Sequence, residues 1–252
     1  MQTQYFKRYS PALGRDMECK VYGHAGRPVL FVPCQDGHYY DFENFNMTDT
    51  WGPWIESGQV MVLAVDTIDQ ETWSDFNGDP NWRARRHEQW VHHVAHEMAP
   101  MIQHMAAVGS GREEKQGVLV FGSSMGATHA LNTFLRRPDL FDGVIALSGA
   151  YDARYFFGED YMDSTLYMNS IVDYMANLPA DHDYIPMFNA RNIVLCTGQG
   201  KWEEEMVRTT RIVRDIFVQK GIRATVDFWG YDVDHDWPWW QKQLPYFLDK
   251  VL

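Results

Sequence analysis

The sequence predicts an α/β fold, with a mostly parallel central sheet covered by helices on both faces. Two observations predict it: the apolar runs are short and mostly continuous, and they alternate along the chain with longer stretches of helical pattern, as is typical of a doubly wound sheet. The chain has 252 residues, of which 45% are hydrophobic, and this supplies a core of the size that a single domain needs. We therefore expect one domain over residues 1–252.

Six apolar runs are the candidate strands. Most are continuous rather than alternating in hydrophobicity, as expected for parallel strands that are buried on both faces. They cover residues 28–32, 60–65, 118–121, 144–147, 193–196 and 224–229.

Four longer stretches between or after these runs are the candidate helices. One of them ends at Gly221, a residue suited to the left-handed position that follows a helix. The predicted helices cover residues 82–105, 126–137, 204–220 and 236–251.

The segment 151–190 interrupts the alternation of strands and helices. It is rich in Tyr, Met, Asp and Asn, and it lies between two predicted strands. We interpret it as a short cap-like insertion over the carboxyl edge of the sheet, forming part of a cap and part of a pocket wall.

Charge and cysteine content limit the partners and the compartment. The formal net charge is −12, so we expect no nucleic-acid or membrane partner, because both require a basic face. Aromatic residues reach 15%, which is compatible with an apolar ligand pocket. The three cysteines show no disulfide or metal spacing, and the polar N-terminus shows no signal peptide. A cytoplasmic protein is the simplest expectation.

The stretch Gly122-Ser123-Ser124-Met125-Gly126 matches G-x-S-x-G and makes Ser124 the candidate nucleophile. It lies between a predicted strand and a predicted helix, where a sharp turn projects a serine hydroxyl above the sheet. The N-terminus of the helix favours the negative charge that develops there. The alternative is an ordinary strand-to-helix turn with a capping serine. Ser123 is out of register with the glycines.

A serine nucleophile needs a general base and a group that orients this base. His235 follows the last predicted strand and is the only histidine after residue 182. The acid is expected after the strand at 193–196, where three successive glutamates begin. Glu203 is nearest to the strand and is our preferred acid, with Glu204 as the alternative. The resulting order of serine, acid and histidine is that of α/β-hydrolases.

Acyl transfer also creates a negatively charged oxygen that needs preorganised N–H donors. One donor should be the backbone amide of Met125, the residue after the nucleophile. The second should come from the loop after the strand at 28–32, through the main chain of Gln35 or Asp36. A plain polar loop is the alternative interpretation of this segment.

Four stretches resemble the esterase family of α/β-hydrolases that includes esterase D (S-formylglutathione hydrolase), feruloyl esterase domains and the antigen 85 mycolyltransferases. The likeness spans the chain from about Lys20 to the C-terminus. The Ser-Met-Gly-Ala elbow and the His-Asp-Trp-Pro-Trp-Trp stretch are specific when they occur together. The four stretches are residues 35–42, 122–127, 199–203 and 235–240.

This resemblance implies Ser124 as nucleophile, His235 as base, and backbone donors from Met125 and the early loop. Glu203 matches the acid of the family by position. The resemblance implies a serine esterase without a cofactor, acting on a small-molecule carboxylic ester with a short-chain acyl or aryl group, such as an acetyl or feruloyl ester. The loop around Cys34 differs from that of esterase D, which argues against formylglutathione as substrate.

Other functions stay open at this point. The same residues could serve an acyltransferase or a thioesterase, in which an alcohol or thiol acceptor takes part. A binding module that keeps the fold without catalysis is the second alternative. The sequence leaves homo-oligomerisation open.

Two further groups of residues resemble metal sites. His92 and His96 are four residues apart on a predicted helix, but they do not complete the zinc-protease pattern H-E-x-x-H. Asp232 and Asp234 match the start of a calcium-binding loop, but Trp237 stands where that loop requires glycine. We therefore expect no metal site.

Overall fold

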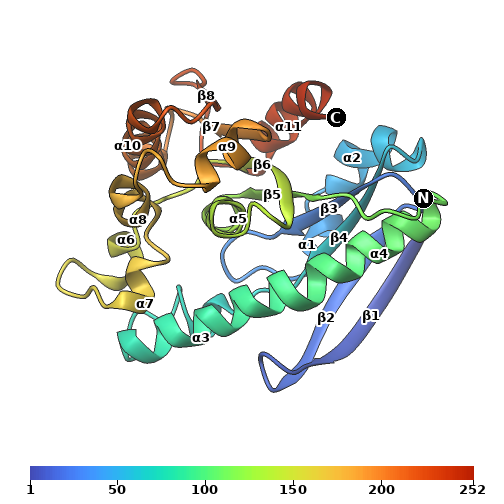
Figure 1. Cartoon of the computed structure of the whole chain (residues 1–252), viewed down its shortest axis with the longest axis horizontal. Coiled ribbons are helices and arrows are strands. Elements are labelled where there is room, and N and C mark those ends of the chain that lie inside the picture. The colour runs from blue at the N-terminus through green and yellow to red at the C-terminus, as the bar shows by residue number, and fades with distance from the viewer.

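The central feature of the computed structural model, which describes residues 1–252, is an eight-stranded sheet (Figure 1). The strand order is β1-β2-β4-β3-β5-β6-β7-β8, and all pairs from β4 to β8 are parallel. The strands are β1 (Thr3–Ser10), β2 (Arg15–Tyr22), β3 (Arg27–Val32), β4 (Val60–Val65), β5 (Val118–Ser123), β6 (Phe141–Leu147), β7 (Asn192–Thr197) and β8 (Thr225–Phe228).

The six predicted strands are all present, and the mostly parallel α/β-hydrolase sheet is confirmed. Two further strands, β1 and β2, were not among those predicted, and they form an antiparallel hairpin at the edge of the sheet. Most residues of β1 are exposed, and its sequence lacks the continuous apolar run by which the other strands were recognised. In β2, the buried Met17, Cys19 and Val21 alternate with polar residues, a period of two that is typical of an antiparallel strand.

The predicted helix at 82–105 begins two residues earlier and continues four residues further. The Asp79 carboxylate accepts a hydrogen bond from Trp82 N and caps its start. The helix consists of α3 (Pro80–His93), the π-helical turn η2 (Val94–Met98) and α4 (Ala99–Gly109), and this α3–α4 rod crosses the lower part of Figure 1. The other long helices are α2 (Met47–Glu56), α5 (Met125–Arg136), α10 (Glu204–Lys220) and α11 (Trp237–Val251).

Helices cover both faces of the sheet because each central strand sends apolar side chains to both sides. In β3, Leu30 and Val32 pack into the larger core with α3, α4, α5 and α10. The alternate residues Val29 and Phe31 pack into a second core with α2 and α11. Figure 1 shows α2 and α11 together on the side opposite to the α3–α4 rod. None of the helices has the length and apolar character that crossing a bilayer requires.

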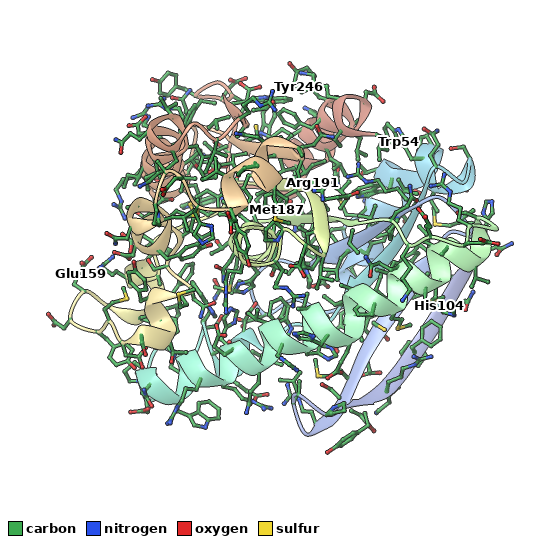
Figure 2. All side chains as sticks on the ribbon, in the orientation of Figure 1. Trp54, His104, Glu159, Met187, Arg191 and Tyr246 are labelled. Atoms are coloured by element: carbon green, nitrogen blue, oxygen red, sulfur yellow. The ribbon has the colours of Figure 1, made fainter.

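The segment 151–190 folds into short helices rather than one separate cap. They are α6 (Arg154–Phe157), α7 (Ser164–Tyr167), α8 (Ile171–Asn177) and α9 (Tyr184–Asn189). The loop between α6 and α7, which carries Glu159, projects from the body of the molecule (Figure 2). Ile171 and Phe188 are buried in the main core, so α8 and α9 mainly cover the sheet. Tyr155 and Phe156 of α6 line the pocket described below.

The remaining short helices are α1 (Asp41–Asn44) and the 3₁₀ helix η1 (Asp69–Glu71), which follow β3 and β4. Since neighbouring strands from β4 to β8 are parallel, the loops after them meet at the carboxyl edge of the sheet. The structure places all of the predicted site residues in these loops or directly after them. This edge is where α/β sheets bind their ligands.

Candidate active site

Ser124 occupies the sharp turn between β5 and α5. Its backbone has φ 56° and ψ −130°, a conformation that is uncommon and strained for a residue with a side chain. The turn is tight: a Cβ atom on Gly122 would lie 2.2 Å from Gly126 O, and one on Gly126 would lie 2.3 Å from Pro33 O. The two glycines of the motif are therefore required by close backbone approaches.

The two serines of the motif have different environments. Ser123 is the last residue of β5, is fully buried, and its hydroxyl has no hydrogen-bond partner. Ser124 is partly exposed and lines a cavity at the sheet edge. Only Ser124 is accessible to a substrate.

His235 lies above Ser124 in the loop between β8 and α11. Its Nε2 is 2.8 Å from Ser124 Oγ, which is hydrogen-bond distance for proton transfer. Its amide donates to Lys201 O at 3.0 Å, and its ring packs edge-to-face against Trp240 at 5.0 Å between centroids. These contacts fix the backbone and one side of the imidazole.

Glu203 is the glutamate that faces His235. Its Oε2 is 3.4 Å from His235 Nδ1, and the residue is only 1% exposed. The adjacent Glu204 begins α10 and is exposed to solvent. The structure thus brings Ser124, His235 and Glu203 together and leaves Glu204 outside the cluster.

Two hydroxyl groups that the sequence analysis missed bind the Glu203 carboxylate. Ser148 Oγ donates to Oε1 at 2.6 Å, and Thr197 Oγ1 donates to Oε2 at 2.8 Å. Ser148 Oγ also accepts a hydrogen bond from Trp240 Nε1 at 3.1 Å. Both hydroxyls belong to residues at or just after the ends of β6 and β7, and that position is the only sequence signal that could have identified them.

The predicted oxyanion-hole donors differ in what their amides bind. Met125 N lies in the first turn of α5, where the helix supplies no acceptor. Asp36 N already donates to Asp69 Oδ2 at 3.3 Å, whereas Gln35 N has no partner in the chain. Gln35 also lines the cavity beside Ser124 and Met125. Of the two residues considered for the second donor, the geometry favours Gln35.

Backbone strain is concentrated around this cluster. Five residues other than glycine have positive φ angles, and four of them lie in the loops at the carboxyl edge of the sheet. Strained conformations persist only where the surrounding structure fixes them, and they are common at functional sites. The four are Asp36, Ser124, Ser148 and Trp202.

A cavity of about 280 Å³ opens at Ser124. Apart from His235, the side chains that line it are uncharged, and most are apolar or aromatic. Two of the aromatic residues are largely exposed, Tyr155 at 55% and Trp202 at 70%, so they stand at the mouth of the cavity. The lining residues are Gln35, Ser124, Met125, Ala150, Tyr155, Phe156, Trp202, Met206 and His235.

Cys34 is close to the site but is not a competing nucleophile. Its Sγ donates to Ser123 O at 3.4 Å. Burial raises the pKa of this thiol far above its usual range, and nearby carboxylates act in the same direction. Since the thiolate is the reactive form, this raised pKa disfavours Cys34 as a nucleophile at neutral pH.

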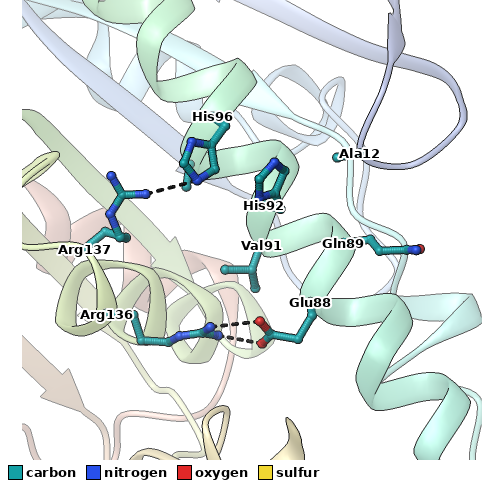
Figure 3. A pocket seen from close by; sticks show the side chains of 9 residues that line it. Ala12, Glu88, Gln89, Val91, His92, His96, Arg136 and Arg137 are labelled. Carbon is teal, nitrogen blue, oxygen red and sulfur yellow. Dashed lines mark hydrogen bonds and ion pairs between the residues drawn. The ribbon is translucent and has the colours of Figure 1, made fainter.

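A separate hollow between α3 and α5 contains the histidine pair of the sequence analysis (Figure 3). The rings of His92 and His96 lie 4.2 Å apart, and Arg137 Nη1 lies 3.2 Å from His96 Nε2. Arg136 forms a two-bond ion pair with Glu88. The two imidazoles have no third side chain beside them that could complete a metal site.

Comparison with known proteins identifies the family. The sequence profile of the family described as "Putative esterase" matches residues 10–250. No curated protein matches the chain in sequence.

Solved structures with the same fold include three that cover almost the whole chain. A ferulic acid esterase has a TM-score of 0.73 and 17% identity, covering 99% of this chain and 97% of its own. An S-formylglutathione hydrolase from Agrobacterium tumefaciens has a TM-score of 0.71 and 15% identity, covering 99% and 95%. MPT51 (FbpC1) from Mycobacterium tuberculosis has a TM-score of 0.73 and 14% identity, covering 100% and 98%.

At these identities the structural likeness establishes only a shared fold. The family is established by the profile match, which extends over nearly the entire chain. The resemblance inferred from the four sequence stretches is therefore confirmed. The protein belongs to this esterase family of α/β-hydrolases and is a carboxylic ester hydrolase.

Proposed function

We propose that the protein hydrolyses esters through an acyl-enzyme formed on Ser124. The observation that carries this proposal is the 2.8 Å distance between His235 Nε2 and Ser124 Oγ at the strained turn. As Ser124 Oγ attacks the ester carbonyl, its proton passes to His235 Nε2. Glu203, behind the imidazole, stabilises the imidazolium that forms and holds it in the productive orientation.

The remaining steps follow from the same three groups. The amides of Met125 and Gln35 donate to the oxyanion of the tetrahedral intermediate. When the C–O bond of the ester breaks, His235 gives its proton to the departing alcohol. The acyl group stays on Ser124. A water molecule then gives a proton to His235 as it attacks the acyl carbonyl, and His235 passes this proton to Ser124 Oγ when the bond to Ser124 breaks and the carboxylic acid leaves.

The cavity supports a substrate with a small, uncharged acyl part. About 280 Å³ accommodates a short acyl chain or a single aryl ring, and no lysine or arginine lines it to bind a carboxylate or phosphate. Tyr155 and Trp202 at the mouth offer flat surfaces for an aryl or sugar group. We propose short-chain acyl or aryl esters of the acetyl or feruloyl type, and the ferulic acid esterase of the same fold supports this choice.

A panel of esters tests the proposal. It contains p-nitrophenyl esters from acetate to decanoate, together with methyl ferulate, and is assayed with the wild type and with Ser124→Ala. We expect kcat/KM to be highest for acetate or ferulate, to fall for long chains, and to be lost in the variant. Preference for a long-chain or charged acyl group would overturn the substrate class. Faster acyl transfer to an added alcohol or thiol than to water would indicate a transferase.

A further inference from the structure

The loop that carries Gln35 is held from behind by the loop that follows β4. We define the oxyanion loop as residues 33–39 and the β4 loop as residues 66–69. Thr67 donates to Gly37 O from its amide at 3.3 Å and from its hydroxyl at 2.9 Å. Tyr39 N donates to Asp66 Oδ1 at 2.9 Å. Three hydrogen bonds therefore fix the second half of the oxyanion loop.

Asp69 fixes the first half of the same loop. It is 2% exposed, and its Oδ2 accepts the 3.3 Å hydrogen bond from Asp36 N. This bond holds Asp36 at φ 57°, a left-handed conformation in which a residue other than glycine is uncommon. With the Asp36 amide turned back to Asp69, the neighbouring Gln35 is the residue that faces the cavity.

His129 binds the other oxygen of the same carboxylate. Its Nε2 lies 3.0 Å from Asp69 Oδ1, and its side chain has no exposed surface. The tautomer with a proton on Nε2 donates to the carboxylate, so both oxygens of Asp69 accept hydrogen bonds. Trp73, Trp90 and His87 surround the imidazole at centroid distances of 5.2, 5.2 and 4.8 Å.

The positions of these residues in the fold connect the two oxyanion-hole amides. His129 lies in α5, five residues after Ser124, and the first residue of α5 is Met125. The oxyanion loop carries Gln35. Asp69 therefore joins the helix of one donor to the loop of the other through two hydrogen bonds, a buried one to His129 and a partly buried one to the Asp36 amide.

We infer that Asp69 and His129 are positioning residues that set the distance between the amides of Met125 and Gln35. This inference rests on the proposed function. An oxyanion hole acts only if its donors stand where the charged oxygen will be, before the reaction begins. A loosened hole weakens binding of the transition state more than binding of the substrate, so its loss lowers kcat with little change in KM.

Three variants separate this role from simple support of the fold. Asp69→Leu removes the acceptor of the Asp36 amide. Asp69→Asn keeps an oxygen for that amide, and its NH₂ can donate to His129 in the other tautomer. His129→Gln keeps an N–H donor near the position of Nε2. We expect kcat to fall by about 10–100-fold in Asp69→Leu, less than the ~10²–10³-fold lost with a whole donor, and by less than about 5-fold in the two conservative variants.

A matched control exists in the same molecule. Glu97 is also a carboxylate that binds a buried histidine, with His93 Nδ1 at 2.7 Å, and it also accepts a backbone amide, Ala12 N at 3.1 Å. Both contacts lie away from the active-site cavity. Glu97→Leu is expected to lower the melting temperature and to leave kcat unchanged.

The experiment measures kcat and KM for p-nitrophenyl acetate with each folded variant. Low kcat in Asp69→Leu with KM within about 3-fold of wild type, and recovery in Asp69→Asn, supports the inference. Unchanged kcat in folded Asp69→Leu, or an equal loss in Glu97→Leu, overturns it. If Asp69→Leu does not fold, Asp69→Ala, which also removes the acceptor of the Asp36 amide, replaces it, and unchanged kcat in folded Asp69→Ala overturns the inference. Wild type without turnover, or Ser124→Ala with full turnover, would instead reject the proposed function.

Discussion

Ser148 Oγ donates a 2.6 Å hydrogen bond to Glu203 Oε1 and thereby connects the end of β6 to the acid behind His235. Ser148 itself has φ 57° and accepts a hydrogen bond from Trp240 Nε1. The tryptophan also packs against the imidazole of His235. One serine hydroxyl therefore helps to fix both the acid and the ring that supports the base.

Replacing Ser148 by alanine should leave Glu203 with one hydroxyl donor, from Thr197, and Trp240 Nε1 without an acceptor. We expect kcat to fall by about 3–10-fold and the free energy of unfolding to fall by about 1–3 kcal/mol, the usual range for a buried group left unpaired. Steady-state kinetics and urea unfolding measure both. A fully active variant would show that Thr197 alone suffices to orient the acid.

The assignment of the acid is tested by a pair of neighbouring glutamates. Glu203→Gln keeps the shape of the side chain but removes the charge that stabilises the imidazolium. We expect kcat to fall by about 10²–10⁴-fold, by analogy with amide replacement of the acid in other triads. Glu204→Gln, at an exposed position, is the matched control and should keep full activity. The opposite result would transfer the role to Glu204.

The tight approach at Gly126 predicts that even a methyl group is not tolerated there. A Cβ atom would lie 2.3 Å from Pro33 O and 2.4 Å from Val32 O, so Gly126→Ala must push α5 away from the oxyanion loop. We expect a loss of about 1–3 kcal/mol in stability, as for overpacking, with kcat lowered more than KM is changed. Gly52→Ala, in α2 with no atom near the new methyl, should keep activity. Equal activity of the two variants would contradict the close approach.

Stability should fall as the pH is lowered through the histidine range. Desolvation lowers the pKa of His87 well below its usual value, and His129 and Arg136 add to this effect. His87 therefore stays neutral in the folded protein, while the unfolded chain binds a proton below about pH 6.5. Because the unfolded state then holds more protons, the free energy of unfolding decreases as the pH falls from about 7 to 5.

A variant tests this pH dependence. His87→Phe removes the proton uptake, so the slope of the unfolding free energy against pH should become shallower by up to about 1.4 kcal/mol per pH unit. Urea unfolding at pH 7.5, 6 and 5 measures it. His104→Phe, on the exposed side of α4 (Figure 2), should leave the slope as in wild type. Identical slopes for His87→Phe and wild type would mean that His87 binds its proton equally well in both states.

The sequence predicted those parts of the molecule that depend on local pattern. The continuous apolar runs from β3 to β7 marked the central strands, and the motif around Ser124 marked the turn. The exposed β1 has too few apolar residues to be seen, and its partner β2 becomes recognisable only by its alternation. Edge strands are specified by their neighbours rather than by their own composition.

The residues of the active site likewise divide into those that local pattern predicts and those that depend on tertiary contacts. Ser124, His235 and Glu203 could be predicted because each follows a recognisable strand. Ser148, Asp69 and His129 could not, since their roles arise from side chains that meet only when distant loops come together. The choice between Gln35 and Asp36 also depended on a tertiary contact, the hydrogen bond from the Asp36 amide to Asp69.

The central claim is that Ser124 is an activated nucleophile, and reaction with a fluorophosphonate probe tests it most directly. The folded wild type and Ser124→Ala are treated in parallel, and the labelled peptide is identified by mass spectrometry. We predict a single phosphonylated site at Ser124 in the wild type and no labelling in the variant. A folded wild type that stays unlabelled, or that is labelled elsewhere, would contradict the account.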